Sequence, residues 1–553
     1  MLLRLFRQLA SQLSGNATRN RPRAPGPSIE QLRKQADALV REQRWSAAAG
    51  VLSELVSRDI DDAWPYATLG SLLHRAGERD QAVALYHAAL ERDPFQKSAI
   101  FNLPKLLLEV SDWDAVRALR ERLDRLRERG MEWRDFVSPF NAVILPLSRR
   151  DQAQVSEFHS RGVQASVSGE TVARAQRGAR TRIRVGYLSA DFHDHATAHL
   201  TASMYGLHDR ARFEVFGYSI GPDLEDSYRA RIREGCDEFV DLSGLSDHEA
   251  AARIAADAVD VLVDLKGYTQ GDRPRILAYR PAPTQAHYLG FPGPLGAPFI
   301  DYAICDAVVV PPSHEPDYRE AIVRLDPCYQ VNDGSQPPVL GGASRGEHGL
   351  PEGTTVLCSF SQNYKIEPLV FDAWMRVLRE LPESVLWLLC GDRTARAALQ
   401  READKRGVAP QRIIFADFKP RRQHLERIAL ADVALDTYFY NGHTTCSDTL
   451  WAGVPVVTCL GDAFAGRVGA SVVAAAGLPE LVTPDLERYA NLAIELCREP
   501  GRIAALKQRL QKGRSTCALF DTRRTTRQLE RAYEQMLERN LAGLPPRPLN
   551  ASI

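Results

Sequence analysis

Long hydrophobic runs and closely spaced cysteines are both missing from this 553-residue sequence. About 20 consecutive apolar residues are needed to cross a bilayer, so we expect no transmembrane segment. The nine cysteines stand singly and no two have CxxC spacing, so neither a zinc ribbon nor a disulfide framework is indicated. Single cysteines of this kind are typical of a reducing compartment, and we expect the protein to be cytoplasmic.

An excess of charge of either sign is also missing, because 70 Lys and Arg balance 70 Asp and Glu. A general nucleic-acid-binding protein needs a net basic surface, so the balanced charge argues against this class. The sequence contains no GxxxxGK[ST] motif, and no GxGxxG follows a predicted strand. If the protein binds a nucleotide, it does so without either of these glycine-rich loops.

The N-terminal segment lacks acidic residues. Residues 1–27 contain five arginines and three prolines, and Arg4 and Arg7 interrupt the apolar start. There is no apolar stretch followed by an A-x-A site, so we do not interpret the segment as a signal peptide. Its composition predicts a flexible basic tail.

The first folded region is predicted to be a helical repeat. Residues 63–94 follow the spacing of a tetratricopeptide repeat, a helix pair of about 34 residues. Small Gly70 and Ala82 let the paired helices approach, and large residues fill the space between them. Looser copies precede and follow, with Pro104 at a small-residue position. We therefore predict tetratricopeptide repeats over 28–130, which bind peptides or helices; a helical bundle that only packs is the alternative.

Strands alternate with helices beyond a predicted helical linker at 131–180, which is typical of parallel, doubly wound sheets. Gly, Pro, Ser and Asn are concentrated at 330–354, so we predict two domains, 181–345 and 346–553. An amphipathic helix near the C-terminus is expected to dock, with the first of these domains as one candidate partner. Apolar runs predict strands at 182–190, 213–220, 238–242, 259–265, 285–290 and 301–306, and then at 355–361, 384–391, 412–418, 433–438 and 455–461.

A polar turn joins a predicted strand to a predicted helix within YFYNGHTTCSDTLWAG, residues 438–453. The first N–H groups of a helix are unpaired and the helix dipole favours an anion, so this turn is a candidate phosphate site. Gly442 lets the backbone come close, and Thr444 or Thr445 is expected to cap the helix. His443 adds a donor near the phosphates, and Asp448 is placed to accept hydrogen bonds from a ribose. An ordinary capped turn is the alternative.

Two further stretches carry candidate binding residues. Gln362 and Lys365 follow the first strand of the second domain, where a lysine would neutralise a leaving diphosphate. His424 and Arg427 lie three residues apart on a predicted helix, where the imidazole could stack on a base. A surface lysine and a solvated helix start are the structural alternatives.

The first α/β domain contains a cluster of histidines after its first strand. Asp191 ends that strand, and His195 and His199 stand four residues apart at the start of the next helix, a spacing that also suits zinc. No third ligand is apparent, so we favour an acid–base histidine oriented by a carboxylate over a metal site. Polar residues that cap a helix are the structural alternative. Gly- and Pro-rich loops at 265–271 and 288–301 could line the same cleft.

Together these segments resemble the catalytic half of the O-linked N-acetylglucosamine transferases, which also carry tetratricopeptide repeats ahead of that half. The resemblance covers roughly residues 30–540, and the chain looks like a bacterial member with a short repeat array. It rests on the segments GYLSADFHDHATAHL, LVDLKGYTQGDRPRILAYRPAPTQAHYLGFPGPLGA, SQNYKIEP, SVLWLL, RIIF and LADVALDTYFYNGHTTCSDTLWAGVPVVT.

The resemblance implies a GT-B fold of two Rossmann-like domains with a cleft between them, no metal and no cofactor. It also implies an enzyme that transfers N-acetylglucosamine from UDP-N-acetylglucosamine to a serine or threonine hydroxyl of a protein, with inversion. The residues that it assigns to the donor are Gln362, Lys365, His424, Arg427, His443, Thr444, Thr445 and Asp448, with His199 grouped beside them. The residues that it assigns to the sugar and acceptor end are Asp191, His195, Leu289 and Gly290.

The resemblance does not settle which residue takes the proton from the acceptor hydroxyl. We take His195 as the candidate base and Asp191 as a weaker one. Animal members have a histidine where this sequence has Phe140, so their arrangement for this step does not carry over completely. Other readings are the same fold with UDP-glucose or GDP-fucose as the donor, a glycogen-type enzyme, and a non-catalytic repeat scaffold that binds a UDP-sugar.

Overall fold

The computed structural model describes residues 27–42, 44–58, 61–167, 169, 171–339 and 341–553. The chain forms two compact units, one ending at Val137 and the other spanning Ser138–Ile553. The predicted basic tail at 1–27 lies, but for its last residue, outside the described residues. Among the described residues, no helix is both long enough and apolar enough to span a bilayer.

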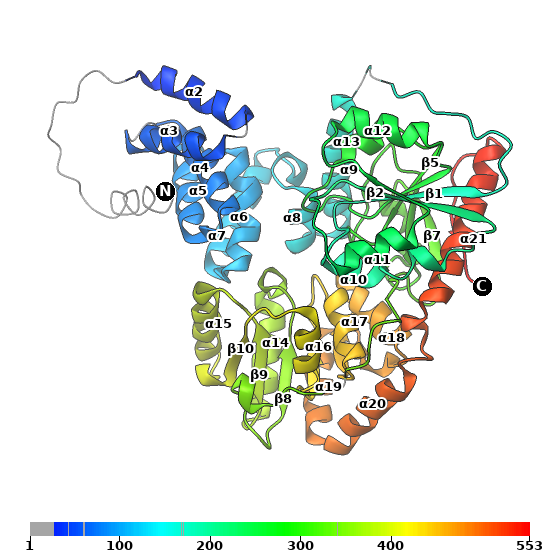
Figure 1. Ribbon diagram of the computed structural model, residues 1–553. Helices are drawn as coiled ribbons and strands as arrows, with labels where there is room; N and C mark the ends of the chain where they lie inside the picture. Colours follow the sequence, from blue (N-terminus) through cyan, green and yellow to red (C-terminus); the bar gives the residue numbers. More distant parts are fainter. Residues whose placement is uncertain (1–26, 43, 59–60, 168, 170, 340) are drawn as a thin grey trace. The chain divides into compact units, whose positions relative to one another are not determined.

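The first unit consists of helices packed in consecutive pairs (Figure 1). Gly70 lets α4 (Ala63–Arg75) and α5 (Arg79–Arg92) pack closely, because a Cβ at this position would lie 3.1 Å from the ring of Tyr86. Ala82 and Tyr86 are both fully buried between the two helices. Among the described residues of this unit, the helices are α2 (Ile29–Arg41), α3 (Trp45–Ser57), α4 (Ala63–Arg75), α5 (Arg79–Arg92), α6 (Lys97–Glu109) and α7 (Trp113–Glu128), followed by a 3-10 turn at Trp133–Asp135.

The second unit contains two sheets in which every described strand pair is parallel. The first sheet has eight strands in the order β14-β7-β6-β5-β4-β1-β2-β3. Its strands are β1 (Ile183–Ser189), β2 (Phe213–Ser219), β3 (Glu238–Asp241), β4 (Val261–Asp264), β5 (Thr284–Tyr288), β6 (Tyr302–Asp306), β7 (Ala321–Leu325) and β14 (Leu549–Asn550).

The second sheet has six strands in the order β10-β9-β8-β11-β12-β13. Its strands are β8 (Val356–Ser359), β9 (Val385–Leu389), β10 (Ile413–Ala416), β11 (Val433–Leu435), β12 (Val456–Cys459) and β13 (Val482–Thr483). A helical region followed by two parallel-sheet domains is the fold class that the sequence predicts, and the prediction is confirmed. Three edge or near-edge strands, β7, β13 and β14, were not predicted from the sequence.

Helices cover both sheets. Helix α12 (Asp247–Ala256) starts with a capping box, in which Ser246 and Glu249 satisfy each other's backbone N–H groups. The helices are α8 (Pro139–Ile144), α9 (Arg149–Ser166), α10 (Ala196–Thr201), α11 (Ser227–Gly235), α12 (Asp247–Ala256), α13 (Pro274–Ala278), α14 (Pro368–Glu380), α15 (Arg393–Lys405), α16 (Arg421–Ile428), α17 (Thr444–Trp451), α18 (Val468–Ala475), α19 (Leu486–Arg498) and α20 (Pro500–Gly513). Short 3-10 turns occur at Tyr205–Leu207, Pro312–Asp317, Gly346–His348, Asn363–Lys365, Pro410–Arg412, Phe464–Gly466, Pro479–Leu481 and Ala518–Phe520.

The C-terminal helix α21 (Thr522–Leu541) returns to the first sheet, which it contacts at β4, β5 and β7 (Figure 1). Its apolar face, predicted from the sequence, is buried there. The hydroxyl groups of Tyr533 and Tyr187 lie 3.1 Å apart, and Glu530 accepts a 2.7 Å hydrogen bond from the backbone N–H of Asp209. Residues 522–553, which the sequence analysis groups with the second domain, therefore complete the first sheet.

Candidate active site

The turn between β11 and α17 is organised by a buried carboxylate. Asp436 accepts hydrogen bonds from the backbone N–H groups of Gly442 (2.7 Å) and Thr437 (2.9 Å) and from the hydroxyl of Thr458 (2.8 Å). Burial raises the pKa of Asp436 to about 6, and these donors oppose the shift. A Cβ on Gly442 would lie 3.2 Å from an Asp436 oxygen and from the backbone nitrogen of Cys446, so a side chain at this position would be crowded.

Helix α17 begins without a side-chain cap. The N-cap residue is His443, and its side chain makes no capping hydrogen bond. The prediction that Thr444 or Thr445 caps the helix is therefore wrong, because both lie inside the first turn. A helix that leaves its first N–H groups without a side-chain partner keeps them available to an anion.

The imidazole of His443 is neutral in this environment. Burial and the nearby Lys365 hold its pKa well below the usual value. Its Nε2 atom is buried and has no hydrogen-bond partner within the described part of the protein. A buried polar atom without a partner is uncommon in folded proteins, and a bound ligand is one way to supply the missing partner.

Lys365 reaches the same turn from the other side. It ends a 3-10 turn after β8, and its Nζ atom donates a 2.9 Å hydrogen bond to the carbonyl of Asn441. The ammonium group also lies 3.8 Å from the ring centroid of Tyr440. Burial lowers the pKa of Lys365 to about 7, and Asp436 opposes the shift. Gln362, the N-cap of the same 3-10 turn, is exposed.

Arg421, three residues before His424, was not predicted from the sequence as a site residue. Its guanidinium donates to both carboxylate oxygens of Asp448, at 2.6 and 2.7 Å, and to the side chain of Gln336 at 2.7 Å. It also lies 2.9 Å from Nδ1 of His199 on α10. Helix α10 of the first sheet domain packs against α17 of the second. Arg421 therefore bridges the two domains, because it contacts both His199 and Asp448, the residue expected to bind a ribose.

His424 and Arg427 interact with each other as the sequence spacing suggests. Two guanidinium nitrogens of Arg427 lie 2.9 and 3.1 Å from Nδ1 of His424. Burial and the Arg427 charge lower the pKa of His424 to about 4, so its imidazole is neutral. Arg427 itself is only 1% exposed, so it supports the imidazole from inside the domain.

At the end of β1, Asp191 and His195 come together with a lysine that the sequence analysis did not single out. Lys266 donates to both oxygens of Asp191 at 2.9 and 2.8 Å. Nδ1 of His195 lies 3.4 Å from Asp191 and accepts a 3.2 Å hydrogen bond from the backbone N–H of Thr197. Burial lowers the pKa of His195, Asp191 opposes this shift and Lys266 adds to it.

Leu289 and Gly290 lie directly against the loop that carries Lys266. Leu289 has a positive φ of 73°, which is uncommon for a residue with a side chain. A Cβ on Gly290 would lie 2.0 Å from the carbonyl oxygen of Leu265. Glycine is therefore required at 290 for the two loops to meet.

The histidines near Asp191 do not assemble a metal site. His199 bonds to Asp194 through Nε2 (2.6 Å) and to Arg421 through Nδ1. In the part of the chain that the structure describes, no three His, Cys, Asp or Glu side chains are grouped to hold a metal ion.

Two parallel-sheet domains, joined where α10 meets α17, define the GT-B class of glycosyltransferase folds. Within that class, the sequence profile of glycosyl transferase family 41 matches residues 120–337 and 330–529, and the chain belongs to this family.

Three relatives are informative. A probable UDP-N-acetylglucosamine–peptide N-acetylglucosaminyltransferase of Arabidopsis thaliana is 37% identical over 425 residues, covering 74% of this chain and 44% of the relative. The enzyme of that name from Caenorhabditis elegans is 28% identical, covering 74% and 46%. The chain thus spans less than half the length of these curated relatives. The solved structure of a Thermobaculum terrenum O-GlcNAc transferase mutant superposes with a TM-score of 0.76 at 28% identity, covering 93% of this chain and 98% of that one.

Proposed function

We propose that this protein is an inverting, metal-independent glycosyltransferase that moves N-acetylglucosamine from UDP-N-acetylglucosamine to serine or threonine hydroxyls of proteins. One observation carries the proposal: Lys365 and the uncapped start of α17 are brought together from two different strands of the second sheet. They form a positively polarised site where a diphosphate leaving group would sit. Family membership and the names of the relatives agree with this chemistry.

The donor is proposed to bind along α17 and α16. The first turn of α17, with His443, Thr444 and Thr445, would hold the diphosphate through backbone N–H groups and hydroxyls. The remaining contacts are assigned as Asp448 to the ribose, His424 with Arg427 to the uracil, and Gln362 to the nucleotide, with His199 and Arg421 bordering Asp448.

In the proposed reaction the bond between the sugar C1 and the β-phosphate oxygen breaks as the acceptor oxygen bonds to C1 from the opposite face. Negative charge develops on the leaving UDP. Preorganised cationic and N–H groups that face this charge stabilise the transition state more than the ground state. Lys365 and the α17 N-terminus are the groups of this chain that fit this role, and no metal or cofactor is invoked.

The acceptor end of the site is proposed to lie at Asp191 and His195. His195 takes the hydroxyl proton on Nε2, which requires its own ring hydrogen to be on Nδ1, facing Asp191 at 3.4 Å. Leu289 and Gly290 are assigned to main-chain contacts beside the sugar. We further propose that the helical repeats bind protein acceptors and that the protein acts in the cytoplasm.

A thermal-shift comparison tests the donor assignment. UDP, UDP-N-acetylglucosamine, UDP-glucose and GDP-fucose are compared on the wild-type protein and on Lys365→Ala. A ligand at about 100 times its Kd stabilises the native state by about 2.7 kcal/mol. We expect UDP and UDP-N-acetylglucosamine to raise the unfolding midpoint of the wild type only. If only GDP-fucose raises the midpoint, the donor is GDP-fucose and not UDP-N-acetylglucosamine. If no nucleotide raises the midpoint, the proposal that the protein is a glycosyltransferase is contradicted.

A further inference from the structure

A buried ion pair lies beneath His195 that the proposed donor site does not require. Lys266 and Asp191 are 3% and 7% exposed, and the ammonium group donates to both carboxylate oxygens. Two charges are rarely withdrawn from water unless each is matched by a partner with good geometry. The pair stands at the carboxyl ends of β1 and β4, where parallel sheets place their ligands.

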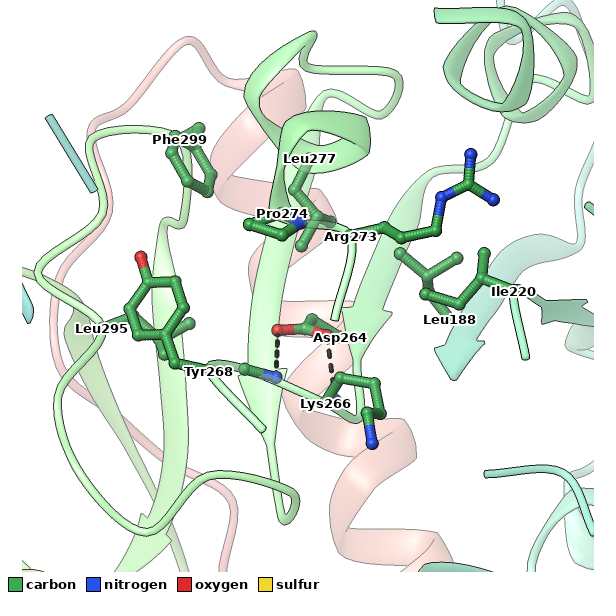
Figure 2. A pocket seen from close by; sticks show the side chains of 11 residues that line it. Leu188, Ile220, Asp264, Lys266, Tyr268, Arg273, Pro274, Leu277, Leu295 and Phe299 are labelled. Carbon is green, nitrogen blue, oxygen red and sulfur yellow. Dashed lines mark hydrogen bonds between the residues drawn. The ribbon is translucent and has the colours of Figure 1, made fainter. Parts of the chain in front are cut away.

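The fold aims Lys266 at Asp191 by fixing its backbone. The carboxylate of Asp264 accepts 2.9 Å hydrogen bonds from the N–H groups of both Lys266 and Gly267. Gly267 has φ +53°, and a Cβ there would lie 2.4 Å from the Cβ of Phe291, so only glycine permits this turn. Figure 2 shows the result: the ammonium of Lys266 points away from the small internal pocket that its backbone borders.

His195 is the third member of the group. Its side chain is 42% exposed, so it is the member that a ligand can reach, and its Nδ1 lies 3.4 Å from the Asp191 oxygen that Lys266 also holds. The hydrogen bond from Thr197 N–H makes Nδ1 the acceptor nitrogen in the free protein. When Nδ1 instead carries the hydrogen, Asp191 is the acceptor within reach, and Nε2 is then free to accept a proton.

We propose that Lys266 is a positioning residue of the transfer reaction: it fixes Asp191 as the carboxylate that orients His195 and thereby assigns the acceptor proton to His195. The inference rests on the proposed function. The hydroxyl proton passes to Nε2, Nδ1–H donates to Asp191, and neither Asp191 nor Lys266 changes its protonation. Both oxygens of Asp191 accept hydrogen bonds from the ammonium of Lys266, so His195 is the member of the group that is placed to take the acceptor proton.

Neighbouring charges affect the pKa of His195. Asp191 favours the imidazolium, whereas Lys266, His193 and His199 oppose it. Lys266 and the imidazole contact the same oxygen, so their nitrogens are at most roughly 6 Å apart. At that distance one charge shifts a titration by about 0.5–2 pH units, depending on the effective dielectric constant.

The test is the pH profile of kcat/KM, whose ascending limb follows the pKa of the base in the free enzyme. Lys266→Gln keeps a donor for Asp191 but removes the positive charge, so we expect the limb to move by about 0.5–2 units to higher pH. Asp191→Asn removes the negative charge, and we expect a lower rate with the limb moved to lower pH. Lys266→Arg keeps the charge and should leave the limb in place.

Controls separate this inference from folding and from the proposed function. Lys405→Gln, the same substitution at an exposed lysine of α15, should leave the profile unchanged. The double variant Lys266→Gln, Asp191→Asn leaves no unpaired charge and serves if Lys266→Gln fails to fold. The inference is overturned if the ascending limb of a folded Lys266→Gln variant stays in place. It is also overturned if the limb of the double variant coincides with that of Asp191→Asn. Loss of the limb in Asp191→Asn would show that Asp191 is the base, which would overturn the inference as well. Absence of transfer by the wild type would instead reject the proposed function.

Discussion

The ammonium group of Lys365 lies 3.8 Å from the ring centroid of Tyr440. A cation over an aromatic face is stabilised by the ring, yet this one is also withdrawn from water, and burial lowers its pKa to about 7. In the free protein the lysine therefore changes charge close to neutral pH. We expect the lysine to gain a full positive charge when a diphosphate binds next to it.

Binding of UDP should take up a proton above pH 7. The free lysine is then mostly neutral, and a diphosphate favours its charged form, so the affinity for UDP should fall by up to about tenfold per pH unit above 7. Isothermal titration calorimetry at pH 8 in two buffers of different ionisation enthalpy measures the uptake. We expect close to one proton at pH 8 and less at pH 6. Equal values at the two pH values would show that Lys365 is already charged in the free protein.

Breaking the bridge between Arg421 and Asp448 should destabilise the second unit. Their side chains are 11% and 9% exposed, and Arg421→Met would leave a largely buried carboxylate without its partner. The expected loss is about 3 kcal/mol in the free energy of unfolding, measured in urea. Arg422→Met is the matched control, because this neighbouring side chain is 85% exposed. Adding Asp448→Asn to Arg421→Met should recover part of the loss; no recovery would contradict the ion-pair explanation.

Two glycines in the helical repeats should respond in opposite directions to alanine. Gly70→Ala places a methyl group 3.1 Å from the ring of Tyr86 and should destabilise the α4–α5 pair by about 1–3 kcal/mol. Gly50, within α3, has no atom near its Cβ position, so Gly50→Ala should stabilise by up to about 1 kcal/mol through helix propensity. Hydrogen exchange of the repeat helices measures both effects. A stabilising Gly70→Ala would show that the helices are less closely packed than described.

Acidification should loosen the docking of α21. Burial lowers the pKa of His208, so its neutral form stabilises the fold and this stability is lost as the pH falls below 6.5. Burial raises the pKa of Glu530, but hydrogen bonds from His208 and Asp209 lower it by more. The contribution of Glu530 to the free energy of unfolding is therefore lost at still lower pH. Glu530→Gln should reduce the free energy of unfolding at pH 7.5 by about 1–3 kcal/mol.

The surface residue Glu534, one turn further along α21, supplies the control for that measurement. It pairs with Arg212 at the protein surface, and Glu534→Gln should change the free energy of unfolding by less than about 1 kcal/mol. If both glutamine variants lose the same stability, the buried contacts of Glu530 are not what holds the helix.

Much of the fold follows from local patterns in the sequence. Apolar runs locate the central strands because strands buried on both faces are continuously hydrophobic. The short strands β13 and β14 have two residues each and carry no such signal. β14 pairs with β7 across more than 200 residues of chain, a relationship that only the tertiary structure defines.

The candidate site was predictable to a similar degree. Lys365 and His443 stand out because each follows a strand within a polar turn. Lys266 and Arg421 do not, since a lysine in a glycine-rich loop or one of two adjacent arginines is usually solvated. Their importance comes from partners far along the chain, Asp191 and Asp448. Whether a charged side chain is paired in the interior depends on packing, which a single sequence does not reveal.

Direct transfer of sugar is the most decisive measurement. The full chain is incubated with UDP-N-acetylglucosamine and a peptide library rich in serine and threonine, and the products are analysed by mass spectrometry together with the release of UDP. The account predicts one N-acetylhexosamine on a serine or threonine hydroxyl, UDP released in equal amount, and loss of both with Lys365→Met. Transfer that persists undiminished in Lys365→Met, or UDP binding with no transfer to any peptide or protein acceptor, would contradict it.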